Sequence, residues 1–382
     1  MFTRIDCPPI RGGQLTIGYA AELAARFRSS SVHEFCSDFG INFRNLAQGC
    51  EEELQAFADL TNNDVDLLRR FSTIHQPDGT VRLGNALLTK HVMSRSTIRV
   101  CPDCVAEDIS SNLSVSPDIA VIWRRDWVIN SVDTCPIHSR PLSEIARISA
   151  SNLQWDATLA WSDLSLELDA LLASPVRREP HGLQAYSIAR LEGHVEQVEL
   201  LDGLPLYSAI AVCAKFGALS MNIEKHWRTL DENTRHNAYR EGFEVLSRGS
   251  EGIAALIDRR MTALQLAGTP PPSIGPSTLL KQVSTFLNGT DESAYSLLRY
   301  LVANAVFDVL SIGPEDGPVL GVRCTYRRTY SIMAAARRFG LPEKTFALYA
   351  EAAGVAERNA HGSLRIDAPK ADAYFGERWR LH

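Results

Sequence analysis

Two short cysteine-containing turns constrain the fold of this chain more than any other feature. The first is Arg99–Cys104, with the sequence RVCPDC, and the second, about 30 residues later, is Thr134–His138, with the sequence TCPIH. Each turn offers two soft ligands three residues apart, and its proline restricts the backbone. Such a set suits a closed tetrahedral site. The sequence therefore predicts one structural zinc ion, with the ligands Cys101, Cys104, Cys135 and His138.

Other interpretations of the cysteines are less well supported. A redox-active Cys-x-x-Cys pair would not need the second turn, which ends in His138. A chance arrangement would not explain the repeated Cys-Pro. The remaining cysteines are isolated, and in a reducing compartment such residues mostly act as small core side chains. A second site is conceivable, but its spacing has no turn signature; its ligands would be Cys7, Cys36, Cys50 and His33.

The segment between the two turns predicts β-structure. Within Asp118–Val132, apolar residues fall at even spacing among β-forming neighbours, at Val121, Trp123, Trp127 and Ile129. This pattern predicts a strand or hairpin that leads into the second turn, and hence a small zinc ribbon.

The two tryptophans of this segment have two interpretations. Together with Arg124 and Arg125 they could stack on bases or hold phosphate. Covering a zinc core that has few aliphatic residues is the favoured interpretation, because so small a domain buries little apolar surface of its own.

The rest of the chain predicts helices. Leu15, Tyr19, Leu23 and Phe27 recur on one face of a helix within residues 13–28. Further helices are expected over 31–40, with a capping box at its start, and over 42–46, 52–60 and 63–71, the last capped by Asn62 or Asn63. The order of residues in Val32–Leu46 is typical of a helix-turn-helix. The favoured interpretation is that this hairpin packs in the core, and the alternative is that it contacts DNA. A later apolar helix, 204–219, is expected to end or bend at Gly217.

At 382 residues the chain is long enough for several domains. The expected fold class is mainly α: a multi-domain helical protein with a small zinc ribbon and a C-terminal winged-helix-like helix-turn-helix. The expected segments are an N-terminal helical, helix-turn-helix-like domain (1–88), a zinc ribbon (89–148), a helical domain (149–266), a Pro-rich linker (267–276), a helical segment (277–322) and a basic winged helix-turn-helix-like module (323–382).

Positive charge is concentrated at the C-terminal end. Residues 320–382 hold 11 Lys and Arg against 6 Asp and Glu, although the whole chain has a net charge of −6. Ser331 is expected to cap a helix that turns at Gly340, and a second helix, a strand over 362–367 and a helix over 368–375 follow. The predicted DNA-facing residues are Arg327, Arg328, Arg337, Arg338, Lys344 and Arg365.

Protein docking remains the alternative role for this hairpin. Few side chains of its second helix could read bases, since its expected outward positions are Glu343, Lys344, Thr345, Ala347 and Leu348.

Several protein classes are not expected. The N-terminus does not resemble a signal peptide, and the longest apolar stretch, Tyr300–Ile312, includes Asn304 and Asp308, so we expect a cytoplasmic protein without a membrane span. A zinc deaminase would need an open coordination position and a His-x-Glu before its cysteines. No phosphate-binding loop of the Gly-x-x-x-x-Gly-Lys-(Ser/Thr) type occurs. The chain is therefore not expected to be an enzyme.

The order of these motifs resembles the TniQ family. The resemblance rests on the helical entry Gly13–Ala24, the turn Arg99–Cys104, the Trp123–Trp127 segment and Cys135–Leu142. It implies that Cys101, Cys104, Cys135 and His138 are the zinc ligands. Gln14 stands where members often have Glu, and only one complete zinc motif is present where some members have two.

The resemblance also implies a function. Members of this family are DNA-binding adaptors that select target sites for transposons and recruit an AAA+ ATPase and a transposase. Some work through an RNA-guided CRISPR effector complex. The implied partners are thus double-stranded DNA, the ATPase and the transposase, with a CRISPR effector and homodimer formation left open. The alternative is a stand-alone transcriptional regulator with the same fold.

Overall fold

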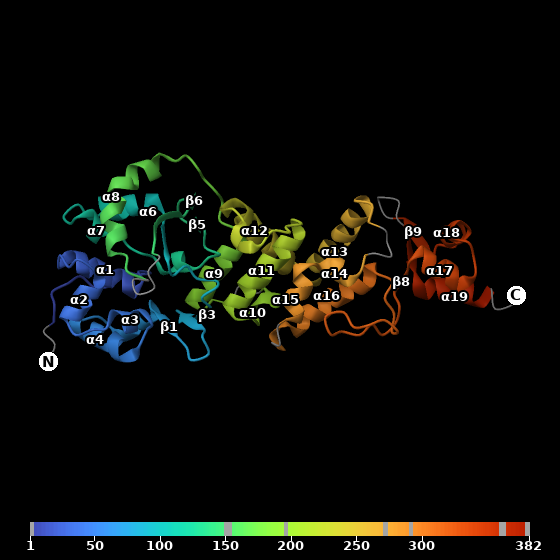
Figure 1. Ribbon diagram of the computed structural model, residues 1–382, viewed down its shortest axis with the longest axis horizontal. Helices are drawn as coiled ribbons and strands as arrows, with labels where there is room; N and C mark the ends of the chain where they lie inside the picture. Colours follow the sequence, from blue (N-terminus) through green and yellow to red (C-terminus); the bar gives the residue numbers. More distant parts are fainter. Residues whose placement is uncertain are drawn as a thin grey trace. The chain divides into compact units, whose positions relative to one another are not determined.

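The computed structural model describes residues 4–148, 155–194, 198–269, 274–289, 293–358 and 364–378. It is mainly helical, as predicted, with small antiparallel sheets (Figure 1). The chain forms two compact units. Met1–Gln197 and Pro205–Ala211 make up unit 1, and Val198–Leu204 and Val212–His382 make up unit 2. The finer division into six segments stays a prediction, and part of the expected linker, 270–273, lies outside the described residues.

Unit 1 combines short helices with three small sheets. Its helices are α1 (Thr16–Arg26), α2 (Val32–Asp38), α3 (Phe43–Ala47), α4 (Glu51–Thr61), α5 (Val65–Arg70), α6 (Pro102–Ser110), α7 (Pro117–Ala120), η1 (Arg125–Val128), α8 (Thr158–Ala173) and α9 (Gly182–Glu192). Its strands are β1 (Thr73–His75), β2 (Val81–Leu83), β3 (Ala86–Leu88), β4 (Thr97–Val100), β5 (Thr134–Cys135), β6 (Arg140–Pro141) and β7 (Ser143–Arg147).

Helix α1 lies at the centre of the N-terminal core. Leu15, Tyr19 and Leu23 are fully buried, as their spacing predicts, whereas Phe27 is half-exposed beyond the end of the helix. The backbone N–H of Leu15 donates to the carbonyl of Trp123 at 2.8 Å, which joins the start of the chain to a segment about 100 residues away. The core therefore includes part of the predicted zinc region.

The helices that follow α1 begin at the expected places, with one difference. The Ser31 side chain caps α2 by accepting from the N–H of Glu34, and Gly40 turns the chain at a φ of +71°. Helix α5 is capped by Asp64 rather than by Asn62 or Asn63. Asp64 stands directly before the helix, where its carboxylate reaches the N–H of Asp66.

The sequence analysis missed a three-stranded antiparallel sheet of order β1-β2-β3. Its strands are only three residues long, too short for a clear alternation of polar and apolar residues. Gly84, in the turn between β2 and β3, has a φ of +55°, and the carbonyl of Leu191 would lie 2.5 Å from a Cβ built there. This sheet therefore packs against the end of α9.

The strand predicted over 118–132 is wrong. This segment contains α7 and the 3-10 turn η1, joined by extended residues that make isolated bridges from Arg124 to Gln14 and from Ile129 to Met93. The strands of the region lie beside the cysteine turns instead, where β4 pairs with β7 and β5 with β6. The even spacing of apolar residues correctly indicates burial, but the burial comes from helices packed around them rather than from a sheet.

Unit 2 is a helical body followed by a small α/β module. The body contains α10 (Glu199–Asp202), the part of α11 (Leu206–Ser220) from Val212 onward, η3 (Trp227–Thr229), α12 (Glu232–Ser247), α13 (Gly249–Leu266), α14 (Pro276–Leu280), α15 (Gln282–Asn288), η5 (Ser293–Tyr295) and α16 (Ser296–Val309). The module contains β8 (Thr329–Tyr330), α17 (Ile332–Phe339), α18 (Glu343–Ala352), β9 (Ala356–Arg358), β10 (Leu364–Asp367) and α19 (Ala368–Arg378).

Glycines allow helices α11 and α12 to approach closely. Gly217 does not end α11, because the helix continues to Ser220. A Cβ at Gly217 would lie 1.7 Å from the carbonyl oxygen of Ala238, and one at Gly242 would lie 1.8 Å from that of Cys213. The two backbones thus touch where side chains would keep them apart.

The C-terminal module has its own core. Ser331 caps α17, and Gly340, at a φ of +68°, turns the chain into α18, as predicted. The three-stranded sheet has the order β8-β10-β9, of which only β10 was expected from the sequence. Phe346 is fully buried and its ring stacks on Phe339 with centroids 5.7 Å apart. Residues 362–363 of the expected strand lie outside the described residues.

No helix in the described part of the chain has both the length and the apolar character needed to cross a membrane.

We expect Gly217→Ala to destabilise unit 2, because its methyl group would overlap the Ala238 carbonyl and force the two helices apart. The expected loss is about 1–3 kcal/mol of the free energy of unfolding, measured by thermal or urea denaturation. Gly203→Ala is the matched control: Gly203 has a φ of −73° and nothing lies within 4 Å of a Cβ built there. Equal stability of the two variants would contradict the close approach.

Candidate metal centre and nucleic-acid interface

The two cysteine turns lie at the ends of regular elements. Strand β4 leads into Cys101, which occupies the N-cap position of α6, and Pro102 is the first residue of that helix. Cys104 therefore lies in the first turn of α6. The second turn connects β5 to β6, and Ser139 closes it at a φ of +47° with its N–H donating to the Cys135 carbonyl at 2.9 Å. Each turn is thus short and rigid at both ends.

The four predicted ligands converge. Cys104 Sγ and Cys135 Sγ are 3.6 Å apart, and His138 Nδ1 lies 3.5, 3.3 and 3.5 Å from the sulfurs of Cys101, Cys104 and Cys135. Zinc with bonds of about 2.3 Å to sulfur and about 2.0 Å to nitrogen would place two sulfurs about 3.8 Å apart and sulfur about 3.5 Å from nitrogen. The observed separations match the edges of that tetrahedron, so the donor set fits one zinc ion.

The surroundings favour a thiolate at Cys135, whereas hydrogen bonds among the three sulfurs, together with burial, raise the pKa of the Cys101 and Cys104 thiols. The three cysteines are buried, and the side chain of His138 closes the fourth direction. Hydrogen bonds from the neighbouring Cys101 and Cys104 hold the pKa of the Cys135 thiol well below its usual range, and the backbone N–H groups of His138 and Ile137 act in the same direction. Four protein ligands leave no coordination position for a substrate. A bound zinc ion would supply a structural cross-link between the two turns.

Carboxylates orient the residues around this centre, and the sequence analysis did not find them. Glu107 Oε1 lies 3.0 Å from His138 Nε2, on the side of the ring opposite the sulfurs. This contact favours the tautomer that has its proton on Nε2 and leaves Nδ1 free for a metal. Its signal in the sequence is the position of Glu107 one turn of helix after Cys104, which is recognisable only once α6 is known to begin at the first cysteine turn.

Arg140 joins both turns to α8. Its guanidinium forms an ion pair with Asp103 of the first turn at 2.8 Å. The other side donates to carbonyls at the C-terminal end of α8, including those of Leu172 at 3.2 Å and Ser174 at 2.8 Å. A cation at this end complements the helix dipole and satisfies carbonyls that have no partner within the helix. The metal centre and α8 therefore support each other.

A buried glutamine holds the second turn from the other direction. The Gln184 side chain, in α9, accepts from the backbone N–H of Thr134 at 3.1 Å and donates to the carbonyl of the same residue. Arg178 adds bonds to the Thr134 hydroxyl and to the carbonyl of Asp133. These bonds fix the residue before Cys135 through side chains that are not metal ligands.

The tryptophans between the turns pack in the interior. Trp123 and Trp127 are both buried, and Trp123 lies against Trp155 and Trp161 with ring centroids 6.0 and 6.1 Å apart. The structure therefore agrees with the favoured interpretation that they cover a core.

The two arginines of this segment are also engaged internally. Arg124 forms two 3.0 Å bonds to Asp108, and its guanidinium lies over the ring of Trp127. Arg125 is buried and forms an ion pair with Glu192. Both arginines hold α6, η1 and α9 together, so they do not form the phosphate-binding patch that was the alternative interpretation.

Gln14 belongs to a buried polar cluster of the same unit. Its side-chain amide donates to Glu22 at 2.9 Å, and Glu22 also accepts from Arg11 at 2.7 Å and Arg26 at 3.1 Å. A neutral Gln14 is suited to this position, because a second carboxylate would lie against Glu22 with only two arginines nearby.

The conceivable second zinc site is not assembled among the described residues. Cys7 Sγ contacts the Tyr19 hydroxyl at 3.3 Å, while Cys36 is buried in the helical core. Neither belongs to a group of convergent ligands with Cys50 and His33 in the described part of the chain.

The six cations predicted to face DNA fall into two groups. Three of them contact the segment that precedes the module. Arg327 donates to Ser311 and forms ion pairs with Glu315 and Asp316. Arg328 pairs with Asp308 at 2.9 Å, and Arg365 donates to the backbone carbonyl of the same residue at 2.7 Å.

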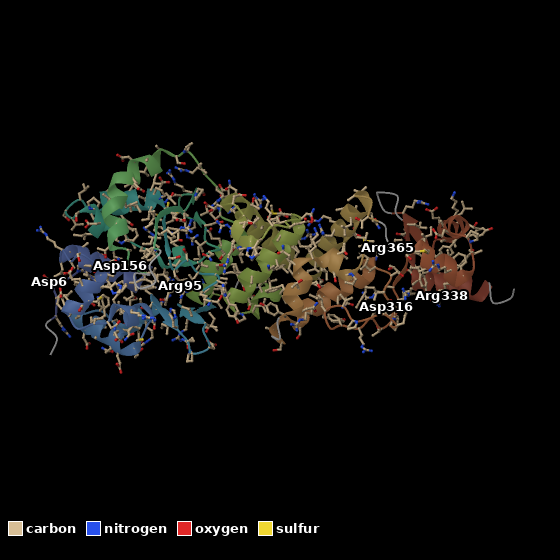
Figure 2. The ribbon with its side chains drawn as sticks, in the orientation of Figure 1. Asp6, Arg95, Asp156, Asp316, Arg338 and Arg365 are labelled. Carbon is tan, nitrogen blue, oxygen red and sulfur yellow. The ribbon has the colours of Figure 1, made fainter. Side chains whose placement is uncertain are left out.

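The other three lie around the α17–α18 turn. Arg337 and Lys344 are exposed, and neither takes part in an ion pair within the described residues. Arg338 is half-exposed and pairs with Asp372 at 2.6 Å. Figure 2 shows Arg338 and Arg365 at separate places on the module. Of the six predicted cations, Arg337 and Lys344 thus have no ion pair within the described residues, whereas the other four are held by neighbouring residues.

We expect Cys135→Ser to lower the zinc content of the purified protein from about one ion per chain to near zero and to unfold the region around the second turn. Serine keeps the size of the side chain but does not offer a thiolate. Metal analysis and limited proteolysis would measure the two effects. Cys50→Ser is the control, since Cys50 is remote in sequence and lies at the N-cap of α4. A folded Cys135→Ser protein that retains its zinc would contradict the assignment.

The region that contains this metal centre matches a known protein family. The TniQ family model matches residues 8–142, which include α1, both cysteine turns and the tryptophan segment. Among curated proteins, no significant match to the chain was found. The match confirms the resemblance predicted from the sequence and indicates a DNA-binding role associated with transposition. Residues 8–142 of this chain are therefore similar to the TniQ family, and the match does not extend over the rest of the chain.

Proposed function

We propose that the protein is a zinc-stabilised, non-catalytic adaptor that binds DNA at transposition target sites and recruits an ATPase and a transposase. The observation that carries this proposal is the TniQ match over residues 8–142, with a closed Cys3His ligand set inside it. A transcriptional regulator of the same fold is less well supported, because the family is associated with transposition.

The ligand set supports a scaffolding role for the zinc. The ligands come from two turns separated by about 30 residues, and the metal would close that loop. Asp103 and Glu107, beside the ligands, are bound to Arg140 and His138. The charged groups next to the metal are therefore engaged in holding its ligands rather than aimed at a substrate.

The C-terminal module is the proposed DNA-binding element, with a winged helix-turn-helix arrangement. Helices α17 and α18 meet at the Gly340 turn, and strands β8, β10 and β9 form a small antiparallel sheet in the same module, which supports this proposal. Arg337, Arg338 and Lys344 would contact phosphates from the edge of this turn.

The exposed side chains of α18 are better suited to binding DNA than to distinguishing its base sequence. Its exposed side chains include Leu348 and Tyr349, which offer no bidentate pairing with a base. Lys344 carries the charge at its N-terminal end. We therefore propose that the module binds duplexes through their phosphates with weak sequence preference, and that target choice depends on the partners.

The N-terminal helical hairpin has less support as a DNA reader. Its second helix, α3, has five residues, of which Phe43, Leu46 and Ala47 are buried. Arg44 is its exposed cation. So short and buried a helix has few side chains available for a groove.

We expect the double charge reversal Arg337→Glu and Lys344→Glu to weaken binding to all duplexes and to flatten the salt dependence of the binding constant. Each lost phosphate contact should reduce the slope of log K against log salt by about 0.9. The control is Arg259→Glu with Lys225→Glu, which changes the net charge equally at exposed positions of the helical body. Fluorescence anisotropy across a salt series would separate them. An equal loss in both proteins would exclude a local site.

We also expect the protein to co-purify with an ATPase and a transposase from its native host, because an adaptor must contact both the DNA and the enzymes. Tandem affinity purification and mass spectrometry would test this. The zinc-deficient Cys135→Ser protein is the control, because it tests whether recovery of the partners requires a folded TniQ region. Recovery of a guide complex would identify that route of recruitment, whereas recovery of RNA polymerase alone would favour the regulator.

A further inference from the structure

We propose that Asn304 and Asp308 of α16 form an internal ligand for Arg328 and Arg365, which keeps these two arginines away from DNA and restrains duplex binding by the C-terminal module. We call these two α16 residues the α16 clasp. This inference rests on the proposed DNA-binding function and concerns its regulation.

The two arginines belong to neighbouring strands of the module. Arg328 directly precedes β8, and Arg365 lies in β10, which pairs with β8 through Ile366 and Tyr330. Both line a cavity of about 400 Å³, together with Asp308 and Lys370. Three cations thus gather beside one acidic residue of the preceding helix.

The α16 clasp presents oxygen atoms to these arginines, as a phosphate group would. Asp308 offers its carboxylate to Arg328 at 2.9 Å and its backbone carbonyl to Arg365 at 2.7 Å. The side-chain oxygen of Asn304 accepts a further bond from Arg328. Guanidinium groups bind carboxylates and phosphates in the same planar geometry. The clasp therefore occupies the donors that a DNA phosphate would use.

Arg328 also retains an unused donor. Its Nε is buried and has no hydrogen-bond partner within the described residues. The clasp is therefore an incomplete ligand for this side chain, and a group with more oxygen acceptors would satisfy it better.

The contact is exposed enough to be exchanged. The Arg328 side chain is 27% exposed and that of Asp308 is 45% exposed. Ion pairs at such positions contribute little to stability and weaken in salt. A DNA duplex, with many phosphates close together, can compete with them.

The acidic groups around the cavity have different origins. Glu357 and Asp367 belong to the module, and Asp367 caps α19 by accepting from the N–H of Lys370 at 3.0 Å. Asp308 is the carboxylate that α16 contributes to the cavity lining. A shift of α16 away from the module would therefore remove one carboxylate and release two cations.

The test is Asp308→Asn in the full-length protein, measured with a labelled mixed-sequence duplex by anisotropy between about 50 and 200 mM salt. Asparagine keeps the shape of the side chain and removes its charge. We expect binding to tighten about 3- to 10-fold at the low-salt end, and the slope of log K against log salt to steepen by about 0.9, as for one added phosphate contact.

Three further variants make the test specific. Asp258→Asn, at an exposed position of α13, changes the net charge equally and should leave the slope unchanged. Adding Arg328→Ala to Asp308→Asn should abolish the gain. Asn304→Ala weakens the clasp without a change in charge and should also tighten binding. Thermal unfolding checks that each protein is folded.

The outcomes separate this inference from the proposed function. Equal slopes for Asp308→Asn, Asp258→Asn and the unmodified protein, all of which bind DNA, would overturn the restraint and leave the function standing. An absence of DNA binding by every variant would overturn both. A gain that survives Arg328→Ala would also contradict the α16 clasp.

Discussion

The convergence of Cys101, Cys104, Cys135 and His138 is the constraint on which unit 1 depends. It joins the start of α6 to the β5–β6 hairpin. Residues of β6 and of α9 also hold the two ligand turns in place. Arg140 links the turns to α8, and Gln184 links the second turn to α9. The matched TniQ region is therefore organised around a small centre whose supports come from helices that lie beyond residue 142.

Arginines connect structural elements inside this protein more often than the distribution of charge along the sequence indicates. Arg124, Arg125 and Arg140 each connect elements of unit 1, and Arg328 connects α16 to the C-terminal module. A planar guanidinium can satisfy several acceptors at once, so it suits junctions where helix ends meet. The distribution of positive charge along the sequence therefore did not reveal which arginines join structural elements, nor the contact that we propose restrains DNA binding.

The proposals divide the work between the two ends of the chain. The TniQ region would provide a zinc-stabilised platform, and the module at the other end would provide affinity for phosphates. The exposed Leu348 and Tyr349 on α18 fit a module that follows the duplex without a strict code. A restraint at Asp308 would let binding respond to a partner that moves α16.

The sequence by itself determined the features that depend on a few adjacent residues. The ligand spacing, the Ser31 and Ser331 caps, the Gly340 turn and the buried face of α1 were all predicted, because caps, turns and metal ligands act locally. Tertiary structure decided the rest. Trp123 and Trp127 are buried by helices rather than in a strand, Gly217 allows a helix crossing rather than ending a helix, and Arg328 and Arg365 meet Asp308. Each of these outcomes depends on which distant residue lies opposite, and hydrophobic periodicity or charge along one segment contains no information about that partner.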